Sequence, residues 1–151
     1  MAHLLELHPV LKTPLLHPEI LYALGSAGHG ARVLIADGNY PLSTEAPPTA
    51  ARVFLNLRRG LVTVSEVLEV LVESIPIEAA TLMEPPEGFP IVVQEDYRKI
   101  LPASTPMTLR KRHDFYAEVK LPATTLVIAT GEARRFANIL LTIGVVNSDP
   151  A

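Results

Sequence analysis

The apolar residues follow two spacings along the chain, one typical of amphipathic helices and one typical of short buried strands. Helical spacing begins beside a proline that suits the first helical position, and it predicts a helix over residues 17–27. Gly28 is expected to end this helix in a left-handed conformation. A capping box formed by Thr63 and Glu66 predicts a second helix over residues 63–75.

Two shorter helices are predicted over residues 91–101 and 112–120, and a proline soon after each of them marks its end. Between the helices lie short runs of aliphatic and β-branched residues, which are typical of strands. The alternation of helices and strands indicates an α/β fold, a sandwich with a mainly parallel or mixed central sheet. The predicted strands are residues 32–36, 51–57, 78–83, 106–109 and 124–129, with a last apolar element over 139–146.

The composition fits a single domain over all 151 residues, whose tail at 147–151 is expected to fray. Apolar residues make up 48% of the chain and charged residues 19%, which is a globular rather than a disordered composition. The 14 prolines argue against a simple helical bundle, because each proline interrupts a helix interior or a central strand.

Charge and residue content exclude several classes of function. The net charge is -3 and the longest basic run has only three residues, 110–112, so no nucleic-acid partner is expected. The chain has no cysteine, which excludes disulfides, thiolate catalysis and cysteine zinc sites. The apolar runs are far shorter than the roughly 20 residues that span a bilayer. We therefore expect no membrane partner and predict a cytoplasmic location.

A histidine and an aspartate flank the first predicted strand. His29 lies between two glycines before the strand, and Asp37 follows the strand, where ligand sites collect in open α/β sheets. The strand holds the two side chains at its opposite ends, so they could share one site only through another subunit or a long loop. The alternative is that His29 is a surface residue at a junction and Asp37 a turn-forming aspartate.

Two further clusters place polar residues next to predicted elements. Residues 112–116 carry an arginine, a histidine and two aromatic rings, which could hold a polyol; the preferred alternative is an amphipathic helix with Phe115 in the core and Arg112 in solvent. Residues 130–138 form a polar loop after the clearest predicted strand, a common position for functional residues. The alternative there is a charged surface hairpin or crossover.

Several stretches of the chain stand out together, in order and in register: LHPEILYAL at 16–24, GHG at 28–30, LIADGNYP at 34–41, Arg112, FY at 115–116, ATGE at 129–132 and FANILL at 136–141. With these stretches the chain resembles the ribose pyranase and fucose mutarotase family of small sugar isomerases, and it is more similar to the fucose branch. The likeness covers nearly the whole chain, more loosely in its middle.

The resemblance implies a three-layer α/β/α sandwich of the ribose pyranase type and an isomerase that interconverts the anomers of a free monosaccharide, L-fucose being the expected sugar. It implies no cofactor and no metal. It also implies a ring-shaped homo-oligomer, commonly a decamer, with sites shared between subunits. By position, His29 matches the catalytic histidine. Asp37, Arg112 and the segment Phe136, Ala137 and Asn138 match sugar-binding residues, with Tyr116 and Glu132 in possible supporting positions.

Two departures from the family pattern bear on substrate and activity. Phe136 occupies a position that is usually tyrosine, which removes a hydroxyl able to hold a sugar oxygen. A turn with two arginines, Arg58 and Arg59, replaces a turn of the Ala-Asp-Gly type. Two alternatives therefore stay open: a sugar-binding oligomer without catalysis, and a mutarotase or pyranase for another sugar such as D-ribose.

Overall fold

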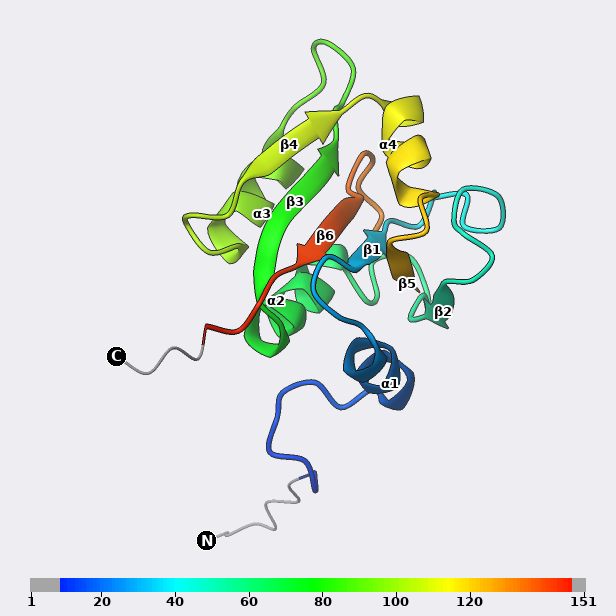
Figure 1. Ribbon diagram of the computed structural model, residues 1–151. Coiled ribbons are helices and arrows are strands. Elements are labelled where there is room, and N and C mark those ends of the chain that lie inside the picture. The colour runs from blue at the N-terminus through cyan, green and yellow to red at the C-terminus, as the bar shows by residue number, and fades with distance from the viewer. Residues whose placement is uncertain (1–8, 148–151) are drawn as a thin grey trace, which may run out of the picture.

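The computed structural model describes residues 9–147, so most of the predicted tail at 147–151 lies outside the described residues. Helices and strands alternate along this part of the chain, as the sequence predicts (Figure 1). In chain order they are α1 (Pro18–Ser26), β1 (Arg32–Ala36), β2 (Ala51–Phe54), α2 (Val64–Ser74), β3 (Ile77–Met83), α3 (Val92–Ile100), β4 (Met107–Arg110), α4 (Arg112–Val119), β5 (Thr124–Ala129) and β6 (Ile139–Ile143).

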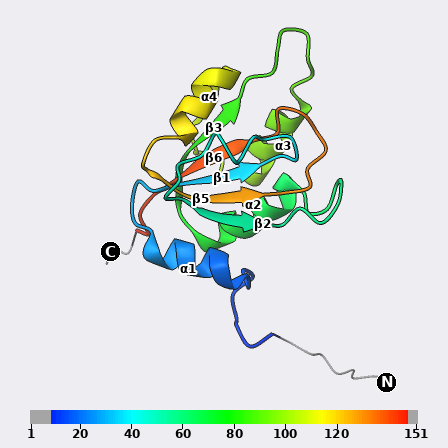
Figure 2. The ribbon, with the colours of Figure 1, turned by 90° about the vertical axis from the view of Figure 1, so that its right-hand side faces the viewer.

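The strands form one mixed sheet in the order β2-β5-β1-β6-β3-β4. Neighbours pair in parallel at β2–β5, β5–β1 and β3–β4, whereas β6 runs antiparallel to β1 and β3 on either side of it. All strands except β6 therefore point the same way, which confirms the predicted mixed sheet. Figure 2 shows β2, β5 and β1 with their arrowheads at the same edge.

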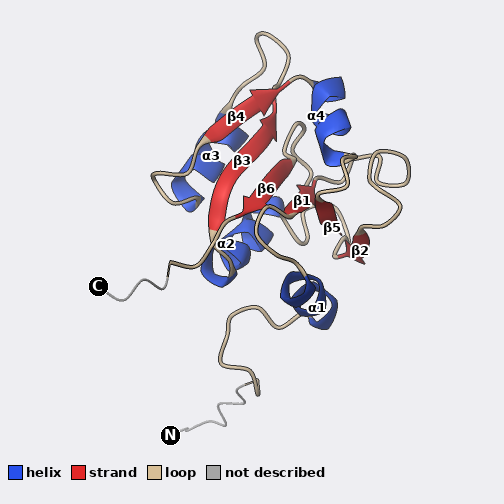
Figure 3. Ribbon diagram, viewed as in Figure 1, coloured by secondary structure: helices blue, strands red, loops and turns tan. Residues whose placement is uncertain are grey.

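Helices or ordered loop cover both faces of the sheet, which gives three layers (Figure 3). Side chains alternate across β1: Val33 and Ile35 join the core under α1, α2 and α3, while Leu34 and Ala36 join the core under α4. Four residues of the segment between β1 and β2 also pack into this second core. A central strand with apolar residues on both faces is expected when both faces are covered.

The ends of the helices show which local predictions hold. Thr63 and Glu66 form the predicted capping box at the start of α2, each side chain bonding the backbone N–H of the other residue. The prediction for Gly28 is wrong: α1 ends at Ser26, its cap residue Ala27 is extended, and the left-handed glycine is Gly30, with a φ of 87°. The turn into β1 thus needs its glycine two residues later. Within residues 9–147, no helix combines the length and the apolar character that crossing a membrane requires.

Candidate functional site

Three loops meet at the carboxyl edge of the sheet because three parallel strands end there at the same level. Ala36 of β1 pairs with Ala129 of β5, and Phe54 of β2 pairs with Ala129 from the other side. The segments that follow these strands are 37–39, 130–132 and 55–61. Since β6 is antiparallel, its first residues lie at the same edge, so Asn138 comes beside the end of β1. This edge is where open α/β sheets collect ligands.

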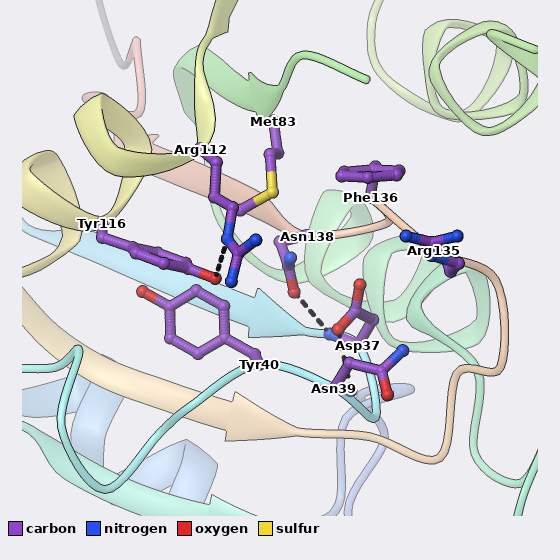
Figure 4. A pocket seen from close by; sticks show the side chains of 9 residues that line it. All are labelled: Asp37, Asn39, Tyr40, Met83, Arg112, Tyr116, Arg135, Phe136 and Asn138. Atoms are coloured by element: carbon purple, nitrogen blue, oxygen red, sulfur yellow. Dashed lines mark hydrogen bonds between the residues drawn. The ribbon is translucent and has the colours of Figure 1, made fainter. Parts of the chain in front are cut away.

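A pocket of about 370 Å³ opens at this edge (Figure 4). That volume lies within the range of roughly 300–1,000 Å³ that is usual for small-molecule sites. Five of the residues that the sequence singled out lie in its wall, together with four others. The wall consists of Asp37, Asn39, Tyr40, Met83, Arg112, Tyr116, Arg135, Phe136 and Asn138.

Asp37 is the buried acid of this pocket, with 5% of its surface exposed. Its two carboxylate oxygens accept hydrogen bonds from the backbone N–H groups of Asn39 (3.0 Å) and Ala137 (3.2 Å), and its own N–H donates to Oδ1 of Asn138 (2.7 Å). Burial raises the pKa of Asp37 above its ordinary value of 3.8, against these N–H groups, which lower it. The charge of Glu132 adds to the increase. The result is a fixed carboxylate with a perturbed pKa inside a cleft, which is typical of functional sites.

An aromatic wall stands opposite the carboxylate. The rings of Tyr40 and Tyr116 meet edge to face at 5.3 Å, and Nε of Arg112 donates to the Tyr116 hydroxyl (3.2 Å). Arg112 forms no ion pair with any residue between 9 and 147, so its remaining N–H groups can donate to a ligand. Aromatic faces with a few fixed polar groups suit a polyol, whose C–H face stacks while its hydroxyls bond.

Phe136 has a left-handed backbone, with a φ of 56°, which is strained for a bulky residue. Two buried side chains of α3 hold this segment: Nε2 of Gln94 donates to the Phe136 carbonyl (3.3 Å), and the Tyr97 hydroxyl donates to the Ala137 carbonyl (2.8 Å). Ala137 is fully buried and does not line the pocket; its N–H instead bonds Asp37. The kink thus serves to present Asn138 and the Phe136 ring to the pocket.

His29 lies away from this pocket, at the opposite end of β1 from Asp37. Its Nε2 lies 2.9 Å from Oε1 of Glu78, and 57% of its side chain is exposed. The five residues of β1 separate the two ends by about 17 Å at 3.3 Å per residue. Within one chain, therefore, His29 and Asp37 do not meet, as the sequence predicts.

Glu132 is buried beside the pocket rather than in it. Its carboxylate accepts from the N–H of Val64 at the start of α2 (3.3 Å) and pairs with Nε of Arg134 (3.2 Å). Arg134 in turn reaches Asp96 of α3 (2.8 Å), and the bond to Glu132 is the main reason that the pKa of Arg134 is raised. This network joins two helices to the loop after β5, so Glu132 supports the site from behind.

Gly131 allows the loops at the sheet edge to pack without a gap. A Cβ at this position would lie 2.5 Å from the Leu61 carbonyl oxygen and closer still to that of Arg58. Both are backbone atoms, which have little room to move. No such contact exists at Gly25 in α1, where a Cβ would meet nothing within 4 Å.

Gly131→Ala is therefore expected to lower the free energy of unfolding by about 1–3 kcal/mol or more, through overpacking. Gly25→Ala, the matched change, is expected to be neutral or to stabilise by up to about 1 kcal/mol, because alanine favours a helix interior. Urea denaturation of both variants measures the difference. Equal stabilities for the two would contradict the close packing at Gly131.

Four residues of the pocket wall could not be identified individually from the sequence, for different reasons. Asn39 and Tyr40 follow Asp37 in the same turn, so the end of the predicted strand could have identified them. Arg135 lies in the polar loop that was singled out only as a segment. Met83 ends β3, which is not adjacent to β1, so no local pattern places it here.

Comparisons with known proteins identify the family of the chain. A model of the RbsD / FucU transport protein family matches residues 10–146. Similar curated proteins include "D-ribose pyranase 2" of Streptomyces griseus, 31% identical over 89% of this chain and 97% of that protein. They also include the "Fucose mutarotase" of Homo sapiens, 30% identical over 90% of this chain and 93% of that protein.

Two solved structures have the same architecture. RbsD of Bacillus subtilis complexed with D-ribose superposes with a TM-score of 0.79 over 91% of this chain and 99% of that chain; at 21% identity this shows the fold. The fucose mutarotase of Streptococcus pneumoniae in complex with L-fucose superposes with a TM-score of 0.72, at 28% identity, over 87% of this chain and 94% of that chain.

Proposed function

Because the chain belongs to the RbsD / FucU family, we propose that it is an isomerase that interconverts the anomers or ring forms of a free monosaccharide. The observation that carries the proposal is the convergence of Asp37, Arg112 and Asn138 in one pocket with an aromatic wall. L-fucose is our preferred substrate. Relatives named for D-ribose and for fucose support the two sugars equally, so D-ribose is the second sugar to test.

The reaction opens and recloses a hemiacetal. A base takes the proton of the anomeric hydroxyl, the bond between the anomeric carbon and the ring oxygen breaks, and an acid protonates that oxygen. Rotation of the resulting aldehyde and the reverse steps give the other anomer. A carboxylate and an arginine suit this chemistry, since charge-assisted hydrogen bonds orient the hydroxyls in the reacting geometry.

In this proposal Asp37, Arg112 and Asn138 hold the sugar, and Asp37 is the group of this chain best placed to accept a proton. His29 acts as the acid only from another subunit, which requires the protein to form a homo-oligomer. We propose that this homo-oligomer is a ring-shaped decamer and that it is located in the cytoplasm. Histidine suits the role because its ordinary pKa of about 6.5 allows proton transfer near neutral pH.

Saturation-transfer NMR on equilibrated sugar tests the function directly. We expect the exchange between α and β signals of L-fucose to be faster with protein than in buffer. D-ribose and D-galactose, measured under the same conditions, rank the substrates. If none of the three sugars exchanges faster than in buffer, the isomerase proposal is wrong.

A second candidate function is sugar binding without catalysis, and Phe136 is the residue that favours it. A tyrosine there would carry a hydroxyl into the pocket wall, where phenylalanine offers none. Calorimetry that detects sugar binding without faster exchange would support this candidate. Phe136→Tyr keeps the aromatic ring and the same backbone conformation and adds only the hydroxyl. If this variant gains activity, the missing hydroxyl is the reason that the wild-type protein lacks catalysis.

A further inference from the structure

A second cavity, of about 560 Å³, adjoins the sugar pocket at the same edge of the sheet. Asn39 and Arg135 line both cavities, so the two adjoin at these side chains. Figure 4 shows both residues at the rim of the first pocket. The other residues of the second cavity come from the turn after β2 and the loop after β5: Gly38, Asn56, Arg58, Arg59, Thr130, Gly131, Glu132 and Ala133.

The lining of the second cavity has an excess of positive charge. Three arginines are among its lining residues, and its one acid, Glu132, is already paired with Arg134, which lies outside the lining. Among the described residues, the side chains of Arg58 and Arg59 form no hydrogen bond and no ion pair. Arg135 lies over the Phe136 ring at 5.2 Å, which leaves the edge of its guanidinium free to donate.

The turn that carries Arg58 and Arg59 is fixed to the loop after β5 rather than loose. The N–H of Gly60 donates to the Gly131 carbonyl (2.6 Å), and the N–H of Gly131 donates to the Val62 carbonyl (2.8 Å). The N–H of Gly38 in turn donates to the Glu132 carbonyl (2.9 Å). The arginine turn therefore has a set position relative to the turn that holds Asp37.

We propose that this second cavity binds the anionic group, phosphate or carboxylate, of a monosaccharide whose ring occupies the first pocket. Guanidinium groups match both anions, because their N–H groups form paired bonds to two oxygens. The shared residues Asn39 and Arg135 stand where the two cavities meet, so an anionic group carried by the sugar ring would pass beside them. This inference rests on the proposed function for the ring's position, and it adds sugar phosphates and sugar acids to the neutral sugars as ligands of the site.

Two matched pairs of sugars test the inference by isothermal calorimetry. They are D-ribose with D-ribose 5-phosphate, and D-galactose with D-galacturonate. The wild-type protein is expected to bind at least one anionic sugar about tenfold or more tightly than its neutral partner, an effect that higher salt weakens. The first pair tests phosphate and the second tests carboxylate.

The double variant Arg58→Gln/Arg59→Gln is expected to lose that preference while its affinity for the neutral sugar stays within about twofold. Lys99→Gln is the control, because Lys99 is an exposed cation on α3 that lines neither cavity. The inference is overturned if neither anionic sugar binds better than its partner, or if the double variant keeps the preference. Tight anion binding that depends on the two arginines, without faster anomer exchange, would support the anion site and contradict the proposed isomerase.

Discussion

Asp37→Asn is expected to lower the rate of anomer exchange about 100-fold or more, the scale of a lost general base. Asparagine has nearly the same shape but cannot take a proton from the anomeric hydroxyl. Both carboxylate oxygens of Asp37 accept backbone hydrogen bonds, from the N–H groups of Asn39 and Ala137. The side-chain NH₂ group of asparagine must therefore face one of these donors, and that hydrogen bond is lost. Saturation-transfer NMR at neutral pH measures the exchange rate.

Asp114→Asn is the matched control, since Asp114 is exposed on α4 and lines neither cavity. It is expected to exchange at the wild-type rate. A loss of activity in both variants would attribute the effect to net charge rather than to the pocket. Thermal unfolding of both variants separates a lost function from a lost fold.

The pH dependence of the exchange provides a second test of Asp37. Burial raises the pKa of this carboxyl, so the active, ionised form is lost at a pH above the ordinary value of 3.8. We expect the exchange rate to fall on acidification with a midpoint above 3.8, and Asp37→Asn to lack that fall. The linked effect on stability has the opposite direction: the contribution of Asp37 is greatest below its unfolded pKa and is lost as pH rises through its folded pKa.

Phe115→Ala is expected to lower the free energy of unfolding by about 3–5 kcal/mol, the usual cost of truncating a buried phenylalanine. The Phe115 side chain is fully buried in the core between the sheet and α4, and its ring meets that of Tyr40 edge to face at 6.3 Å. The change leaves a cavity directly behind the aromatic wall of the pocket. We therefore expect weaker sugar binding as well as lower stability.

Urea denaturation measures this effect, and Tyr22→Ala is its control. Tyr22 lies on α1 with 79% of its surface exposed, so its truncation is expected to change the stability by no more than about 0.5 kcal/mol. A loss below about 1 kcal/mol for Phe115→Ala would contradict the close packing of the second core.

Some residues of the candidate site can be identified from the local sequence, and others cannot. Asp37 follows a strand whose end was predicted correctly, and this is enough to place it at the ligand-binding edge of a parallel sheet. Arg112 is exposed, as the preferred prediction of a solvated helix residue has it, but that prediction did not place it in the pocket wall. Its neighbour Phe115 was predicted correctly as a core residue. Spacing within one helix does not reveal which edge of the sheet the helix packs against.

By itself the sequence determined the elements and their kind. Apolar spacing, a capping box and the positions of prolines are local properties, and the helices and strands they predict are those of the structure. The exceptions are Gly28 and two strand ends, since β2 ends at Phe54 and β6 at Ile143, each three residues before the predicted end. Local spacing also determined that β1 separates His29 from Asp37, because a strand has a fixed rise per residue.

Only the tertiary structure decided which of these residues form one site. The antiparallel placement of β6 brings Asn138 beside Asp37, 101 residues apart, and the pairing of β3 with β6 brings in Met83. The tertiary structure also decided that the arginine turn after β2 lies against the loop after β5. Strand order depends on how both faces of the whole sheet are buried, a property of the assembled core that no single segment of the chain carries.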